Sequence, residues 1–139
     1  MQYTPSVTIL YAGLFGLLLL VLSLNIFREY IRIAINSTAR SEELWKRAER
    51  AQHSFVEFVP MCLVLMFLIE VHGAPSPVLH SLGILLITAR IFHAYGVGKG
   101  SASNVMRIIG TQTTYLTLMI SSLAAIYYSL LPLLFTKVG

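Results

Sequence analysis

Four polar residues recur at helical spacing beside and inside an apolar part of the chain. They are offset by 0, 3, 7 and 10 positions: Arg47, Arg50, Ser54 and Glu57. At about 100° per residue, the four fall within about 80° of one helix face. Arginine forks bind carboxylates and a glutamate binds an amine, so this face suits a zwitterionic ligand. A salt-bridged face that holds neighbouring helices together is the alternative interpretation.

A second polar pair, Arg90 and His93, is three positions apart and shares one helix face. Two structural interpretations compete with a binding role. Arg90 either snorkels to the membrane surface or pairs with Glu57, and His93 is a hydrogen-bonded residue of the bundle. The histidines lack metal-ligand spacing, so the sequence predicts no metal site.

Arg107 begins a stripe of small and polar residues along the last apolar run. The stripe consists of Arg107, Gly110, Thr111, Thr114 and Leu118. Close helix packing through small residues explains most of it. Arg107 fits that explanation poorly, because it lies in the first turn of a helix, where its charge and the helix terminus both favour an anion.

Arg28 and Arg32 lie one turn apart at the end of the first apolar run. Setting the membrane topology is their simpler role. Taken with the other groups, they place several cations and one carboxylate at one end of a helix bundle. A ligand with carboxylates and an ammonium group would satisfy this set, although the spacing alone does not name it.

Four apolar runs must position these residues. They span residues 6–27, 55–71, 78–95 and 105–135, each near the roughly 20 residues that cross hydrocarbon. The composition is 56% hydrophobic and 12% charged, against about 25% charged in soluble domains. The sequence therefore predicts an all-α membrane protein, a four-transmembrane-helix bundle, with residues 1–139 forming a single domain. We expect a helix start at Ser41 and a flexible loop over residues 96–101.

The basic residues gather on one side of the predicted bundle. Nine of the ten share that side: Arg28, Arg32, Arg40, Lys46, Arg47, Arg50, Arg90, Lys99 and Arg107. Only Lys137 lies opposite. The positive-inside rule then predicts that both termini lie outside the cytoplasm, and the short chain favours a bacterial inner membrane.

No basic stripe is interleaved with aromatic residues, so we expect no nucleic-acid partner. Cys62, the single cysteine, is expected to be buried and inert.

The segment of residues 47–60, RAERAQHSFVEFVP, resembles the second-helix signature R-x-x-R-A-x-x-N-x-x-E-x-x-P of a known family. This family is the membrane-associated proteins in eicosanoid and glutathione metabolism (MAPEG). Residues 89–96 and 107–111 are similar to the third- and fourth-helix segments of its bacterial members. The resemblance implies a homotrimer of four-helix subunits in membrane lipid, with glutathione bound between subunits as a co-substrate.

The resemblance also implies roles for individual positions. Arg50 would bind glutathione, Glu57 would hold its α-amino group, and Ser54 stands at the motif's asparagine position. His93 matches a third-helix contact position. Arg107 matches the catalytic arginine that stabilises the thiolate. The cofactor-binding arginine of the first helix would be Arg28 or Arg32, supplied by a neighbouring subunit.

Two departures from the family pattern bear on affinity and specificity: Ser54 replaces an asparagine, and Val97 replaces a common tyrosine. The main hypothesis is a membrane-bound glutathione transferase, with or without peroxidase activity, that attacks a hydrophobic electrophile. One alternative is a non-catalytic lipid- or glutathione-binding membrane protein. The other is a structural membrane subunit or small transporter.

Overall fold

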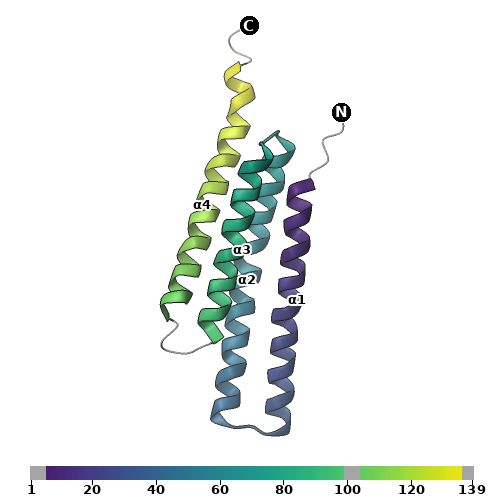
Figure 1. Cartoon of the computed structure of the whole chain (residues 1–139), viewed down its shortest axis with the longest axis vertical. Coiled ribbons are helices and arrows are strands. Elements are labelled where there is room, and N and C mark those ends of the chain that lie inside the picture. The colour runs from purple at the N-terminus through teal and green to yellow at the C-terminus, as the bar shows by residue number, and fades with distance from the viewer. Residues whose placement is uncertain (1–5, 99–103, 136–139) are drawn as a thin grey trace.

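Figure 1 shows the computed structural model, which describes residues 6–98 and 104–135. Within those residues the chain forms four helices and no strand: α1 (Ser6–Ile35), α2 (Ala39–Val71), α3 (Ser76–Gly98) and α4 (Asn104–Phe135). All four are long and apolar enough to cross a membrane. The prediction of an all-α, four-helix membrane protein is confirmed.

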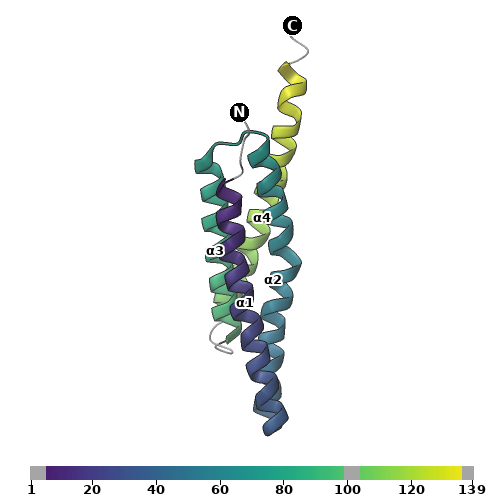
Figure 2. The same cartoon turned by 90° about the vertical axis from the view of Figure 1, so that its right-hand side faces the viewer.

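The helices alternate in direction, so the start of α1 and the end of α4 lie at the same end of the molecule (Figure 1). At the other end, the α1–α2 hairpin projects past the end of α3 and the start of α4 (Figures 1 and 2). The projection follows from length, because α1 has 30 residues and α3 only 23, or about 45 Å against about 35 Å.

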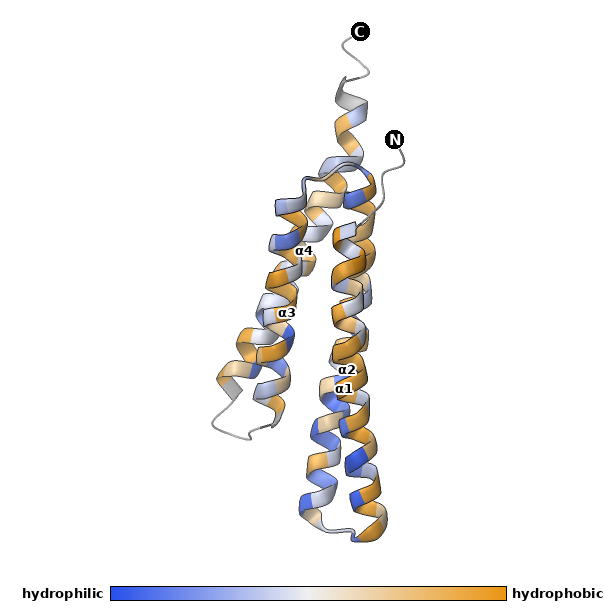
Figure 3. Cartoon of the chain, turned by 45° about the vertical axis from the view of Figure 1, so that its right-hand side comes forward, coloured by the Kyte–Doolittle hydropathy of each residue, from blue (hydrophilic) through white to orange (hydrophobic). Residues whose placement is uncertain are grey.

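Hydropathy divides the projecting hairpin along its length. Apolar colour covers most of the lower part of α1, whereas the lower part of α2 is largely hydrophilic (Figure 3). The hydrophilic start of α2 therefore lies in the part of the hairpin that projects past the end of α3 and the start of α4 (Figures 1 and 3).

The start of α2 differs from the sequence prediction. Thr38 is the cap, in an extended conformation, and Ser41 is the third residue of the first turn. The Ser41 amide donates to Thr38 Oγ1 at 3.2 Å, and the Thr38 amide donates to Ser41 Oγ at 2.8 Å. Ser41 was a plausible cap by residue type. Thr38 caps because its hydroxyl reaches the amide three residues on.

The boundaries of α3 also differ from prediction. The turn after α2 is closed by Gly73, whose φ of 88° suits glycine, and α3 then begins at Ser76. The helix continues through Gly96, Val97 and Gly98, which were predicted to be in a loop. The remainder of that predicted loop lies outside the described residues. Helix continues here because Gly96 packs directly against α4, as described below.

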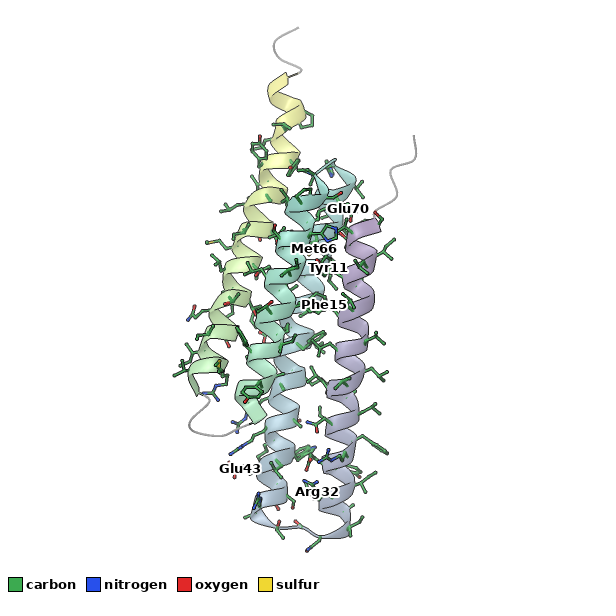
Figure 4. The ribbon with its side chains drawn as sticks, in the orientation of Figure 1. Tyr11, Phe15, Arg32, Glu43, Met66 and Glu70 are labelled. Atoms are coloured by element: carbon green, nitrogen blue, oxygen red, sulfur yellow. The ribbon has the colours of Figure 1, made fainter. Side chains whose placement is uncertain are left out.

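The apolar core runs between the helices through the middle of the bundle. Phe15, Val59, Cys62, Met66 and Leu86 are each at most 1% exposed. Figure 4 shows Phe15 and Met66 in the body of the bundle, between its two ends. The prediction that Cys62 is a buried packing residue is confirmed by its exposure of 0%.

A polar cluster ties the helices together at the end where α1 begins (Figure 4). The Glu70 carboxylate, 2% exposed, accepts the backbone N–H of Val7 at 2.9 Å and that of Thr8 at 2.8 Å. Nearby, the Tyr11 hydroxyl lies 3.2 Å from His80 Nδ1. We call Val7, Thr8, Tyr11, Glu70 and His80 the closed end, because the chain itself supplies partners for the glutamate.

Candidate functional site

A buried arginine joins three helices near the predicted site. Arg90 of α3 is 3% exposed and donates from Nη1 to the Ser54 carbonyl oxygen at 3.1 Å and to Ser54 Oγ at 3.2 Å. Its Nη2 donates to Thr114 Oγ1 of α4. Ser54, Arg90 and Thr114 therefore hold α2, α3 and α4 in register.

Both structural interpretations of Arg90 are wrong. The side chain neither snorkels to the surface nor pairs with Glu57, since its partners are Ser54 and Thr114. Arg90 also does not belong with the loop charges that set the predicted topology. It lies inside the bundle because hydroxyl and carbonyl oxygens from two other helices replace water around Nη1 and Nη2. Its buried Nε has no hydrogen-bond partner among the described residues.

Close backbone contact between α3 and α4 positions His93 and Arg107. A Cβ on Gly96 would lie 2.4 Å from the Arg107 amide nitrogen, and one on Gly110 would lie 2.6 Å from the His93 amide nitrogen. Only glycine allows this approach. His93 is 7% exposed inside this contact, whereas Arg107 is exposed at the start of α4.

The predicted face of α2 separates into three environments. Arg47 forms an ion pair with Glu43, and Ser54 accepts from Arg90. Arg50 and Glu57 are exposed, and neither forms an ion pair with another part of the chain that the structure describes. Within the described part of one copy, no ion pair joins this face to another helix, and its role in binding stays a prediction.

The two arginines of α1 are engaged with a buried acid. Arg32 Nη1 lies 2.9 Å from Glu29 Oε2, and Arg28 Nε lies 3.8 Å from Glu29 Oε1. Within the described residues, α1 packs against α2 and α3 and makes no contact with α4. One copy of the chain therefore does not bring Arg28 or Arg32 to Arg107.

A cavity of about 210 Å³ lies between α1, α2 and the end of α3. None of the seven predicted site residues lines it. Val97, the position of the family's tyrosine, does line it, together with Glu29 and Arg47. Tyr95, the nearest tyrosine, is 50% exposed.

The structure therefore joins Ser54 to Arg90, and it places His93 and Arg107 at the α3–α4 contact further along α3. Arg50 and Glu57 lie one turn before and one turn after Ser54, on the outside of α2. We call Arg50, Ser54, Glu57, His93 and Arg107 the open end. Its chemistry is that of a cationic surface with one free carboxylate, which suits a ligand bearing both anionic and ammonium groups.

A sequence profile of the MAPEG family matches residues 8–127. The chain belongs to the MAPEG family. The sequence resemblance is thus confirmed, and the chain is an integral membrane protein of a family named for eicosanoid and glutathione metabolism. Inner membrane protein YecN of Escherichia coli strain K12 is 32% identical over 124 residues, which cover 88% of this chain and 92% of YecN. The protein of the same name from Escherichia coli O6:H1 strain CFT073 matches equally well.

Sequence reasoning missed three polar groups that organise this MAPEG fold. Glu29 had a usable signal, because Arg32 follows it at helical i, i+3 spacing. Thr114 was noticed as a packing residue, but its bond to Arg90 spans 24 positions. Glu70 had one signal, a carboxylate inside an apolar run. Its partners were not predictable, since they are backbone amides 62 and 63 positions away.

Proposed function

We propose that this protein is a membrane-bound glutathione transferase, with or without peroxidase activity. The observation that carries the proposal is the pair Arg50 and Glu57, two exposed charges on a membrane-spanning helix with no ion pair among the described residues. Charges on transmembrane helices are costly and almost always face a partner or a water-filled cavity. Ligand or a second copy of the chain would supply that partner.

Glutathione has groups that complement the open end. Its two carboxylates suit the forked donors of Arg50 and of a first-helix arginine, and its ammonium group suits Glu57. Ser54 offers a hydroxyl one turn from both charges, and His93 offers a ring nitrogen from α3. Arg107, beside the first turn of α4, would then face the thiol.

Arg107 would act by stabilising the thiolate. A free thiol has a pKa of about 8.5, and each unit of lowering requires about 1.4 kcal/mol of differential stabilisation. One guanidinium together with a helix terminus can supply one or two units. The thiolate sulfur then attacks a hydrophobic electrophile dissolved in the membrane, a carbon–sulfur bond forms, and the leaving group departs with its electron pair.

Trimerisation belongs to the same proposal. Because α1 and α4 of one copy do not touch in the described part of the chain, Arg28 or Arg32 would reach the site of a neighbouring copy. The same neighbour would cover the exposed charges of α2. We further propose an inner-membrane location with both termini outside the cytoplasm, on the strength of the basic residues near the hairpin.

A non-catalytic lipid or glutathione binder is the second candidate, and one contact favours it. Ser54 Oγ already accepts from Arg90 at 3.2 Å. A serine used in this way offers glutathione less than the two donors and one acceptor of an asparagine amide. A binder of this kind would retain affinity without turnover.

Replacing Arg107 with alanine separates the two candidates. We expect conjugation of a model electrophile to lose about 100-fold in kcat, the usual effect of removing one donor that stabilises a developing anion, while glutathione affinity changes by less than about threefold. The ultraviolet absorbance of the bound thiolate should disappear in parallel. Arg40→Ala, at the far end of the hairpin, is the charge-matched control.

Normal turnover in Arg107→Ala would contradict the catalytic role. Glutathione binding with no turnover in the unaltered protein, across several electrophile classes, would favour the non-catalytic candidate.

A further inference from the structure

The apolar surface of α1 is longer than the hydrocarbon layer. Exposed apolar side chains continue from Ile9 to Ile35, a rise of about 39 Å against about 30 Å of hydrocarbon. Arg28 and Arg32, whose side chains are 69% and 44% exposed, mark the polar end of that surface. The hairpin therefore extends into the headgroup layer, with Ile31 41% and Ile35 81% exposed beyond Arg28.

A second cavity opens beside this apolar surface at the hairpin tip. Its volume is about 360 Å³, within the roughly 300–1,000 Å³ range of ligand pockets. It is lined by Arg32, Asn36, Thr38, Arg40, Ser41 and Leu44. This tip pocket lies in the part of the hairpin that projects past α3 and α4 (Figures 1 and 2).

The charge of the tip pocket is positive. Arg40 is exposed and forms no ion pair within the described residues. The Nη1 atom of Arg32 forms an ion pair with Glu29, which leaves Nη2 and Nε of Arg32 as donors. Among the described residues, no carboxylate lines the pocket. Glu29 lies behind Arg32, and Glu42, the acid nearest in sequence, accepts from Ser37.

The hydroxyl groups that line the pocket are already engaged in hydrogen bonds within the chain. Thr38 and Ser41 cap α2 and satisfy each other. Ser41 Oγ also lies 2.8 Å from the Thr38 carbonyl oxygen. The recognition chemistry therefore rests on two guanidinium groups and the Asn36 amide, which together match a phosphate.

We propose that the tip pocket binds the phosphate headgroup of an anionic phospholipid, whose acyl chains lie along the exposed end of α1. Two features select a lipid over a soluble phosphate. The pocket lies at the hairpin tip, where the apolar surface of α1 exceeds the length of the hydrocarbon layer. The exposed Ile31 and Ile35 directly precede its lining residues Arg32 and Asn36 in the chain. The two proposed sites share at most Arg32, which is one of the two candidates for the first-helix arginine of the glutathione site. Arg40, the lead residue of the tip pocket, has no role in the glutathione site.

The experiment uses the full-length protein in phosphatidylcholine nanodiscs, with fluorescent phosphatidylglycerol as the probe. We expect the unaltered protein to retain phosphatidylglycerol in preference to labelled phosphatidylcholine. In Arg40→Gln, retention should weaken about fivefold, or about 1 kcal/mol, because one hydrogen-bonded contact to the phosphate is lost. Arg40→Lys keeps the positive charge but loses the bidentate guanidinium, so its retention of phosphatidylglycerol should lie between that of the unaltered protein and that of Arg40→Gln.

Lys46→Gln is the matched control, because Lys46 is an exposed basic residue of α2 outside the pocket. Its effect should stay below about twofold at physiological salt, because Lys46 does not line the pocket and the field of one exposed charge is screened. Equal losses in Lys46→Gln and Arg40→Gln, or no preference for phosphatidylglycerol, would overturn the proposal. Inorganic phosphate that displaced the labelled lipid at the same concentration would also overturn it, by pointing to a soluble ligand. Thermal stability without the probe lipid confirms that each variant is folded.

Discussion

Two glutamates of α2, Glu70 and Glu57, differ in burial and in hydrogen-bond partners. Glu70, at the closed end, is 2% exposed and accepts two backbone N–H groups of α1. Glu57, at the open end, is exposed and has no ion pair in the described structure. The two residue types are identical, so the difference comes entirely from what the fold places beside them.

The comparison separates structural polar groups from groups available for binding. At the closed end, the carboxylate compensates the free amides at the start of a helix, which is a stabilising arrangement within one chain. At the open end, Arg90 is likewise held by Ser54 and Thr114, but Arg50, Glu57 and Arg107 remain exposed. We expect substitutions at the closed end to change stability, and substitutions at the open end to change binding.

Glu70→Ala should have the largest effect on folding. The substitution leaves the amides of Val7 and Thr8 without an acceptor. At 1–3 kcal/mol for each orphaned group, the free energy of unfolding should fall by about 3 kcal/mol. Denaturation of the detergent-solubilised protein measures this free energy of unfolding.

Glu70→Gln keeps one acceptor oxygen, so its loss of unfolding free energy should be about half as large by the same reasoning. Glu57→Ala, on the same helix, should be close to neutral. Equal losses at positions 57 and 70 would remove the distinction between the ends.

Gly110→Ala should disturb the contact between α3 and α4. The added Cβ would lie 2.6 Å from both the Ala89 carbonyl oxygen and the His93 amide nitrogen, so the helices must separate. Overpacking of this kind costs about 2 kcal/mol. Conjugation activity should fall as well, because Arg107 moves with α4.

Gly13→Ala is the control for that substitution. Gly13 is also helical, but nothing lies within 4 Å of an added Cβ. Since alanine has the higher helix propensity, this variant should be neutral or slightly more stable. Gly110→Ala with the stability and activity of Gly13→Ala would show that close packing does not position Arg107.

Glu57→Gln should weaken glutathione binding and leave folding almost unchanged. Loss of the charge-assisted bond to the ammonium group corresponds to about tenfold in Kd, or about 1.4 kcal/mol, whereas the unfolding free energy should change by less than about 0.5 kcal/mol. Titration calorimetry on the purified protein measures the affinity. Glu49→Gln, another exposed acid of α2, provides the comparison. Equal affinity in the two variants would argue against Glu57 as the ammonium ligand.

Much of the fold was readable from the sequence because membrane helices are specified locally. The four long apolar runs predicted the four helices, because each run lies within one of them. The errors at Thr38 and at Gly96 concern ends, where one hydroxyl or one glycine contact decides whether a helix starts or continues.

The site was only partly readable, for a different reason. Helical spacing grouped Arg47, Arg50, Ser54 and Glu57 on one face, yet their partners come from other helices and give three different environments. Arg90 and Glu70 are held by groups distant in sequence, and no spacing rule predicts such pairs. The roles assigned to Arg50, Glu57, His93 and Arg107 remain predictions that come from the family resemblance.

The central claim is that the open end binds glutathione, and thermal stability tests it most directly. We would compare the unaltered protein and Arg50→Ala with and without reduced glutathione. A ligand at 100 times its Kd stabilises the folded state by about 2.7 kcal/mol, which gives a measurable shift. We predict a shift in the unaltered protein that is lost in Arg50→Ala and kept in Lys46→Ala. No shift in folded, unaltered protein, or an equal shift in Arg50→Ala, would contradict the account.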